Sequence, residues 1–195
     1  MNNKNENKRI IVFIDGSNFY HIIKLLFPDK KPNDFNFEKF VKYLAGNRDL
    51  IRTYYYNVPL DITRDLQSYM KQQKFFDKIQ RIQNFEFVLC RMQKRKVDGQ
   101  IIYEAKEDDI HLAVDMVKLA YNDAYDIAIL ISTDGDFVPA IQAIREKDKV
   151  VENIGFENKF SYHLKKEADK FIFLKKEIIA GFFEKSKNEE KNKKI

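Results

Sequence analysis

Two apolar segments of the chain each run directly into an aspartate. Residues 10–15 read Ile-Ile-Val-Phe-Ile-Asp, and residues 127–134 read Ile-Ala-Ile-Leu-Ile-Ser-Thr-Asp, with Asp136 shortly after. Unbroken apolar runs of this kind are typical of strands buried on both faces of a parallel sheet. Ligands of such sheets bind in the crevice beyond the carboxyl ends of the strands. We therefore expect Asp15, Asp134 and Asp136 to converge there if the two strands are neighbours.

Carboxylates gathered in one place repel each other unless a cation lies between them, so this pattern predicts a divalent metal site. Mg²⁺ fits because it takes oxygen ligands, keeps several waters and binds through a few carboxylates plus a substrate phosphate. Two such ions about 3.5–4 Å apart would activate water and stabilise the leaving oxygen of a phosphodiester. That chemistry requires no histidine, serine or cysteine nucleophile.

A fourth candidate acid, Asp109, opens a helix predicted over 109–121. An acid in a first helical turn also complements the helix dipole without any ligand, so this alternative stays open. Asp115 lies about 120° around the helix from Asp109 at 3.6 residues per turn, so both cannot face one ion directly. Because Asp115 interrupts an otherwise apolar helix, its burial would demand a partner.

The residues after the first strand offer a second polar group. Asn18 could hydrogen-bond a ligand carboxylate or the attacking water, whereas Ser17 is expected to cap the helix predicted over 17–26. Gly16 and Gly135 fit tight strand-to-helix turns, where glycine adopts positive φ freely.

The positive charge of the chain is concentrated in one region. The net charge is +5, and residues 64–106 hold ten Lys and Arg against five Asp and Glu. A localised basic surface is the electrostatic footprint of a phosphate-rich partner, although a solvated helix face gives the same pattern. The Asp98–Gly99 turn predicts a hairpin over 94–104. The candidate phosphate contacts are Arg91, Lys94, Arg95 and Lys96, with Lys71, Lys74, Lys78 and Arg81 on a helix predicted over 61–81.

Strands alternate with helices along the chain, which predicts an α/β fold: a three-layer sandwich with a mainly parallel sheet. A length of 195 residues with 44% hydrophobic residues fits one domain, expected over 9–184. The polar start (1–8) and the Lys-rich end (185–195) are expected to be disordered.

Several classes of protein and site are disfavoured by composition. The single cysteine, Cys90, rules out an internal disulfide and reads as a buried thiol, and the three histidines lack zinc-type spacing. No apolar stretch approaches the length of a membrane span and the polar start is no signal peptide, so we expect a cytoplasmic protein that does not bind membranes.

Residues 13–20, 109–116 and 132–137 resemble, in order and spacing, the three signatures of the NYN domain. More narrowly, they are similar to its LabA-like branch, within the PIN-like nuclease superfamily. The resemblance spans about 9–174. It implies a PIN-like α/β/α sandwich and ribonuclease chemistry that depends on Mg²⁺ or Mn²⁺.

The resemblance implies that Asp15, Asp109, Asp134 and Asp136 bind metal and, with the amide of Asn18, form the catalytic site. Asp115 also matches the pattern, without a clear role. Many members carry Lys-Gly-Val-Asp before the helix, where this chain has Lys-Glu-Asp-Asp over 106–109. Either Asp108 or Asp109 could therefore face the ion.

Three functions compete. The leading hypothesis is a ribonuclease whose partner is RNA, with DNA not excluded. The alternative is an RNA-binding or regulatory module with a weak or inactive nuclease site, which would carry the same residues. A phosphatase of the haloacid dehalogenase type ranks low, because it needs a second Asp where this chain has Ser17. Tyr54, Tyr55 and Tyr56 could stack bases, although strand tyrosines more often pack in the core or at an edge. Apolar residues on edges permit a homodimer.

Overall fold

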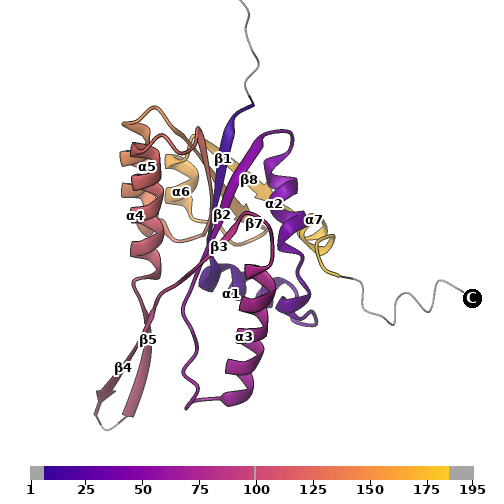
Figure 1. The fold of residues 1–195 in the computed structure, drawn as a ribbon, viewed down its shortest axis with the longest axis vertical. Coiled ribbons are helices and arrows are strands. Elements are labelled where there is room, and N and C mark those ends of the chain that lie inside the picture. The colour runs from indigo at the N-terminus through magenta and orange to yellow at the C-terminus, as the bar shows by residue number, and fades with distance from the viewer. Residues whose placement is uncertain (1–6, 99, 185–195) are drawn as a thin grey trace, which may run out of the picture.

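A six-stranded sheet in which every neighbouring pair runs parallel forms the centre of the molecule (Figure 1). The structure is a computed structural model that describes residues 7–98 and 100–184. The strand order is β3-β2-β1-β6-β7-β8. The bounds are β1 Arg9–Asp15, β2 Asp49–Asn57, β3 Phe85–Leu89, β6 Ile127–Ile131, β7 Val150–Phe156 and β8 Lys170–Leu174. The ends predicted to be disordered lie outside the described residues, apart from 7 and 8.

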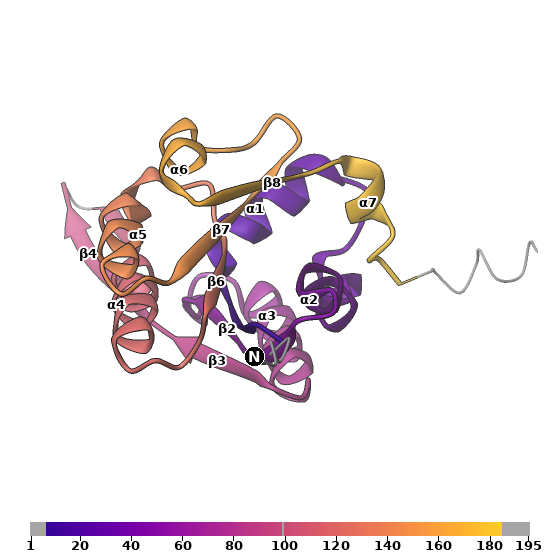
Figure 2. The same ribbon diagram turned by 90° about the horizontal axis from the view of Figure 1, so that it is seen from above.

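Helices cover both faces of the sheet, so the molecule has three layers (Figure 2). One layer contains α1 Gly16–Leu26, α2 Phe37–Ala45, α3 Leu66–Gln80 and α7 Lys176–Ala180. The other contains α4 Asp108–Tyr121, α5 Val138–Arg145 and α6 Tyr162–Glu167. Short 3₁₀ turns span Pro32–Asp34 and Gly135–Phe137. The predicted three-layer α/β/α sandwich is confirmed.

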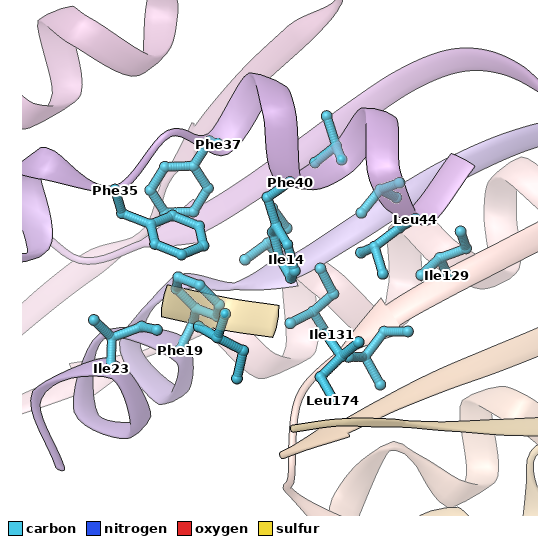
Figure 3. Close-up of a cluster of buried hydrophobic side chains, with 14 of the residues drawn as sticks. Ile14, Phe19, Ile23, Phe35, Phe37, Phe40, Leu44, Ile129, Ile131 and Leu174 are labelled. Atoms are coloured by element: carbon cyan, nitrogen blue, oxygen red, sulfur yellow. The ribbon is translucent and has the colours of Figure 1, made fainter. Parts of the chain in front are cut away.

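The two layers explain why the first strand is apolar at successive positions. Ile10, Val12 and Ile14 belong to the core beneath α1 and α2, whereas Ile11 and Phe13 belong to the core beneath α4 and α5. Figure 3 shows the first core, where aromatic rings from α1, α2 and the loop between them gather over Ile14. Full burial of an Ile or Phe side chain stabilises the fold by about 1.5–3 kcal/mol. This packing on both faces holds β1 rigidly at the middle of the sheet.

Strand β1 also marks the point where the order of the sheet reverses. The chain builds outward from β1 through β2 to β3 on one side, and from β6 through β7 to β8 on the other. Ile14 pairs with Ile131 across the boundary between β1 and β6. Asp15 and Ser132 therefore leave the sheet side by side, at the crevice where ligands of such sheets collect.

The predicted hairpin forms a two-stranded antiparallel sheet of its own, β4 Arg91–Val97 and β5 Gln100–Lys106, with Lys94 opposite Tyr103. We call residues 91–106 the arm. The arm projects from the body at the lower left of Figure 1. It leaves the body after the outer strand β3 and returns directly to the start of α4. Its base is thus beside the residues expected to hold metal.

One predicted helix begins later in the structure than expected. The helix expected over 61–81 starts at Leu66, because the carboxylate of Asp65 caps it by accepting the amides of Gln67 and Ser68. No helix among the described residues combines the length and apolar composition needed to cross a bilayer.

Candidate active site

Asp15 is the buried centre of the candidate site, with a relative exposure of 5%. It follows β1 directly and caps α1: its Oδ1 accepts the amide of Asn18 at 3.0 Å. Its Oδ2 accepts the hydroxyl of Ser132 at 2.9 Å. The prediction that Ser17 caps this helix is wrong, because Asp15 already occupies the capping position.

Burial raises the pKa of Asp15 to about 7, although the hydrogen bonds from Asn18 and Ser132 oppose that rise. The negative charges of Asp109 and Asp108 raise it further. A carboxyl group in such surroundings favours its neutral form until a cation compensates the charge. In this environment Asp15 is therefore better suited to bind a cation than to carry an uncompensated negative charge.

Gly16 allows Asp15 to reach this position. A Cβ atom at Gly16 would lie 2.4 Å from the backbone oxygen of Tyr56 and 2.4 Å from the ring of Tyr55. Neither Gly16 nor Gly135 has the positive φ expected from the sequence. Glycine is required at position 16 by close packing against β2, not by backbone conformation.

Asn18 holds the end of β6 in place. Its Nδ2 donates to Thr133 Oγ1 at 3.1 Å, and its Oδ1 accepts the amide of Thr133 at 3.2 Å. Both ends of the Asn18 amide thus contact the residue before Asp134. From its spacing, Asn18 is expected to hydrogen-bond a ligand carboxylate or the attacking water, whereas in the structure it positions the segment that carries Asp134.

Asp134 and Asp136 lie on the turn that follows β6. The hydroxyl oxygen of Ser132 accepts the amide of Asp134 at 3.1 Å, and Asp134 Oδ1 accepts the amide of Asp136 at 2.9 Å. The buried ring of Phe137 anchors this turn to the core beneath α4 and α5. Asp136 is exposed, so its carboxylate can meet a ligand that arrives from solvent.

The start of α4 brings two further acids. Ser17 Oγ lies 3.4 Å from Asp108 Oδ2, which links α4 to α1. Burial raises the pKa of Asp109 to about 6, with added repulsion from Asp108, Asp134 and Asp136. Asp108 thus faces α1, whereas Asp109 is close enough to the turn after β6 for the charges of Asp134 and Asp136 to raise its pKa. We call Asp15, Asp108, Asp109, Asp134 and Asp136 the acidic cluster.

The donor set of the acidic cluster fits a hard divalent cation, because all its ligand atoms are carboxylate oxygens. As the side chains stand, no three Asp, Glu, His or Cys residues in the described part of the chain are close enough to hold an ion. The structure therefore contains no preformed cage among the described residues, and the convergence of these acids on one ion stays a prediction.

Asp115 does not belong to the acidic cluster. Its Oδ2 accepts the hydroxyl of Tyr56 at 3.0 Å, which is the partner that its place on an apolar helix demanded. Tyr55 and Tyr56 are each 1% exposed, and Tyr54 stacks on Phe13 with ring centroids 5.6 Å apart. The suggestion that these tyrosines stack bases is wrong for Tyr55 and Tyr56, which are core residues.

The four candidate phosphate contacts, Arg91, Lys94, Arg95 and Lys96, are all exposed on the arm. Arg91 Nη2 lies 2.7 Å from Glu107 Oε1, which ties the base of the arm to the residue before Asp108. Lys94 Nζ lies 5.6 Å from the centre of the Tyr103 ring, and Arg64 packs over the same ring at 5.5 Å. The arm is thus a basic surface whose base adjoins the acidic cluster.

Sequence reasoning missed Asn153, which is 0% exposed on β7. Its Nδ2 donates to the backbone oxygens of Leu130 at 3.2 Å and Ser132 at 3.0 Å. The pairing of β6 with β7 ends at Leu130 and Asn153, so this side chain supplies the next donor after the strands separate. An asparagine within the otherwise apolar end of β7 was the available signal, because a buried amide requires partners.

The NYN domain profile matches residues 9–175. The chain belongs to the NYN domain family. This family is part of the PIN-like nuclease superfamily, whose nucleases generally depend on divalent metals. The resemblance noted in the sequence is therefore confirmed, and the acidic cluster of this NYN protein lies where its three signature segments meet.

Two relatives in sequence differ in how much of this NYN protein they match. An uncharacterized protein of Methanocaldococcus jannaschii is 36% identical over 89 residues, which cover 46% of this chain and 37% of that protein. The low amplitude and bright protein LabA of Synechococcus elongatus is 25% identical over 187 residues, which cover 93% of this chain and 91% of LabA. The chain thus spans about a third of the first relative and nearly all of LabA.

A solved structure shares the fold. A protein of unknown function from Vibrio parahaemolyticus superposes with a TM-score of 0.63 at 22% identity, covering 89% of this chain and 96% of that one. The likeness extends over almost the whole of both chains, so the two proteins share the sandwich fold described above.

Proposed function

We propose that this NYN protein is a metal-dependent ribonuclease that hydrolyses phosphodiester bonds of RNA with Mg²⁺ or Mn²⁺. Asp15, Asp109, Asp134 and Asp136 would hold the metal. The observation that carries the proposal is the environment of Asp15: a buried carboxyl, bonded to Ser132 and Asn18, whose pKa is raised by burial and by the acids of α4. A resident cation is the simplest compensation for that arrangement.

The residues around the acidic cluster have separate tasks in this proposal. Ser132 and Asn18 orient Asp15 and the turn that carries Asp134. Asp136 and Asp109, nearer to solvent, would hold the cation on the side from which the RNA phosphate arrives. When bound, the cation supplies activation of water and stabilisation of the leaving oxygen. Since RNA supplies the phosphate and water the nucleophile, no covalent step at a protein side chain is required.

The arm supplies the positive charge that the acidic cluster lacks. Arg91, Lys94, Arg95 and Lys96 would contact phosphates of the RNA on one side of the bond to be cut. Such contacts give affinity without reading sequence, and salt weakens them.

A second candidate is an RNA-binding module that does not cut. The separation of the acidic side chains favours it, because no chelating group of three exists among the described residues as they stand. The arm would serve binding equally in both cases.

A single-turnover cleavage assay distinguishes the two candidates. Labelled RNA is mixed with excess protein and Mn²⁺, and wild type is compared with Asp15→Asn and Asp134→Asn. DNA of the same sequence is run in parallel. We expect wild type to cut RNA and both variants to lose activity while binding RNA normally. No cut by wild type, with normal RNA binding in all three proteins, would establish the binding module instead.

A further inference from the structure

The first turn of α6 borders the acidic cluster on the side away from the arm. A Cβ atom placed on Gly135 would lie 3.4 Å from Ser161 Oγ and 3.8 Å from Cβ and Cδ2 of His163. Gly135 separates Asp134 from Asp136, so α6 begins directly against the acidic turn. Ser161 caps α6 by accepting the amide of Leu164 at 3.3 Å, and Leu164 is fully buried. The start of α6 is therefore anchored firmly beside the cluster.

The residue between Ser161 and His163 is Tyr162, whose side chain is 71% exposed. That is the largest exposure among the large hydrophobic side chains in the part of the chain that the structure describes. Its ring meets the ring of His163 edge-on, with centroids 6.3 Å apart and an interplanar angle of 78°. Most of the tyrosine surface is thus in water, on a residue whose two chain neighbours, Ser161 and His163, approach the acidic turn at Gly135.

The order of the strands places the arm and α6 on opposite sides of the acidic cluster. The arm follows β3 at one outer side of the sheet, whereas α6 connects β7 to β8 at the other (Figures 1 and 2). The acidic cluster belongs to β1, β6 and the start of α4, between them. A nucleic acid strand held by the basic arm and passing the acidic cluster would next meet Tyr162.

A nucleobase is the natural partner of an exposed aromatic ring in that position. Stacking of a nucleobase on an aromatic ring is sequence-tolerant, because every base has a π-face. Within a duplex the faces of the bases are covered by their neighbours, and only unpaired nucleotides can be splayed onto a side chain. A ring that stacks on a base therefore adds affinity for a single strand and adds none for a double helix.

We propose that Tyr162 is a stacking platform for an unpaired nucleobase beside the acidic cluster, and that this side chain makes the protein bind unpaired RNA more tightly than paired RNA. The inference rests on the proposed function for the identity of RNA as the ligand. It adds the residue that contacts the base and that favours unpaired over paired RNA.

Equilibrium binding in EDTA tests the platform apart from cleavage. The probes are a short unpaired RNA, the same RNA annealed to its complement, and a series in which one nucleotide at a time is abasic. The proteins are wild type, Tyr162→Ala, Tyr162→Phe and Tyr121→Ala. Tyr121 is a matched control because it is 50% exposed at the far end of α4. Thermal melting checks that all four proteins are folded.

We expect Tyr162→Ala to weaken binding of the unpaired RNA by about 5- to 150-fold, the range for loss of one base–aromatic stack. Tyr162→Phe and Tyr121→Ala should bind as wild type does. The duplex should bind more weakly and be insensitive to Tyr162→Ala. One abasic position should cost wild type a similar factor and cost Tyr162→Ala nothing further.

Unchanged binding of the unpaired RNA by Tyr162→Ala would overturn the inference, as would an equal loss on the duplex or the absence of RNA binding by wild type. A protein that is not a nuclease would give a different set of results. In that case wild type makes no cut with Mn²⁺ while the Tyr162 effect on unpaired RNA persists. Conversely, metal-dependent cutting without any Tyr162 effect would leave the nuclease standing and remove the platform.

Discussion

Ser132 donates its hydroxyl to Asp15 across the boundary between β6 and β1, at 2.9 Å. The same oxygen accepts the backbone amide of Asp134 at 3.1 Å. One small side chain therefore connects the buried acid of the first strand to the acid that follows the central strand. The hydroxyl sets the distance between two groups that must share a cation if the proposed function is correct.

Removal of the Ser132 hydroxyl tests this connection. Ser132→Ala leaves Asp15 without that donor and frees the amide of Asp134. We expect cleavage to fall by about 10- to 100-fold, the usual effect of losing a group that orients a metal ligand. Stability should fall by about 1–3 kcal/mol, because the buried carboxyl of Asp15 loses a hydrogen-bond donor. Ser132→Thr keeps the hydroxyl and is the control. Equal activity of the Ala and Thr variants would contradict the connection.

The raised pKa of Asp15 predicts how stability depends on pH without metal. The folded-state pKa of about 7 lies above the ordinary value of 3.8, so the folded protein binds this proton more tightly. Its contribution to stability is full below the ordinary value and is lost as pH rises through about 7. The loss amounts to at most about 4 kcal/mol.

Asp15→Asn isolates this contribution, because the amide does not ionise. Urea unfolding in EDTA should show that wild type loses more stability than Asp15→Asn between mildly acidic and mildly alkaline pH. At alkaline pH the variant should be the more stable of the two. Parallel pH profiles for the two proteins would show that Asp15 ionises as an ordinary surface carboxyl does.

Metal should stabilise the wild type most where Asp15 is ionised. Mn²⁺ at about 100 times its dissociation constant would add about 2.7 kcal/mol of stability, measured as an increase in Tm over EDTA. Asp15→Asn and Asp134→Asn should lose most of that increase. Asp115→Asn is the matched control, since Asp115 bonds Tyr56 and not the cluster. A loss in Asp115→Asn as large as in Asp15→Asn would place the ion elsewhere.

Several parts of this arrangement could be predicted from the sequence because they depend on local pattern. The apolar runs ending in Asp15 and Asp134 required strands buried on both faces, and such strands belong at the centre of a parallel sheet. The Asp98–Gly99 turn and its flanking alternation sufficed for the arm. In each case the signal lies within a few consecutive residues.

Other parts depend on contacts between distant segments, which no local pattern contains. The pairing of Asn18 with Thr133 joins residues 115 positions apart, so its role as a positioning group could not be read from spacing alone. Gly16 looked like a turn glycine, but the backbone of Tyr56 is what excludes a side chain. Ser17 was a plausible cap until the structure showed that the last residue of β1 performs that task.

The arm should bind phosphates through charge. Replacing Lys94 and Lys96 by Ala together should weaken RNA binding and reduce the slope of log K against log salt by about 0.7 for each phosphate that the variant no longer neutralises. Lys39→Ala is the control, because Lys39 is exposed on α2 and is not part of the arm; it should leave the slope unchanged. Fluorescence anisotropy over a salt series measures both. An unchanged slope in the double variant would remove the arm from the RNA interface.

In the proposed nuclease site, Asp15 at the end of β1 and Asp134 after β6 share one cation. A crystal soaked in Mn²⁺ and measured at the manganese absorption edge tests it most directly. We predict an anomalous peak between the carboxylates of Asp15 and Asp134, with Asp109 or Asp136 rotated toward it. A well-occupied manganese site elsewhere on the protein, with Asp15 still bonded only to Ser132 and Asn18, would contradict the claim.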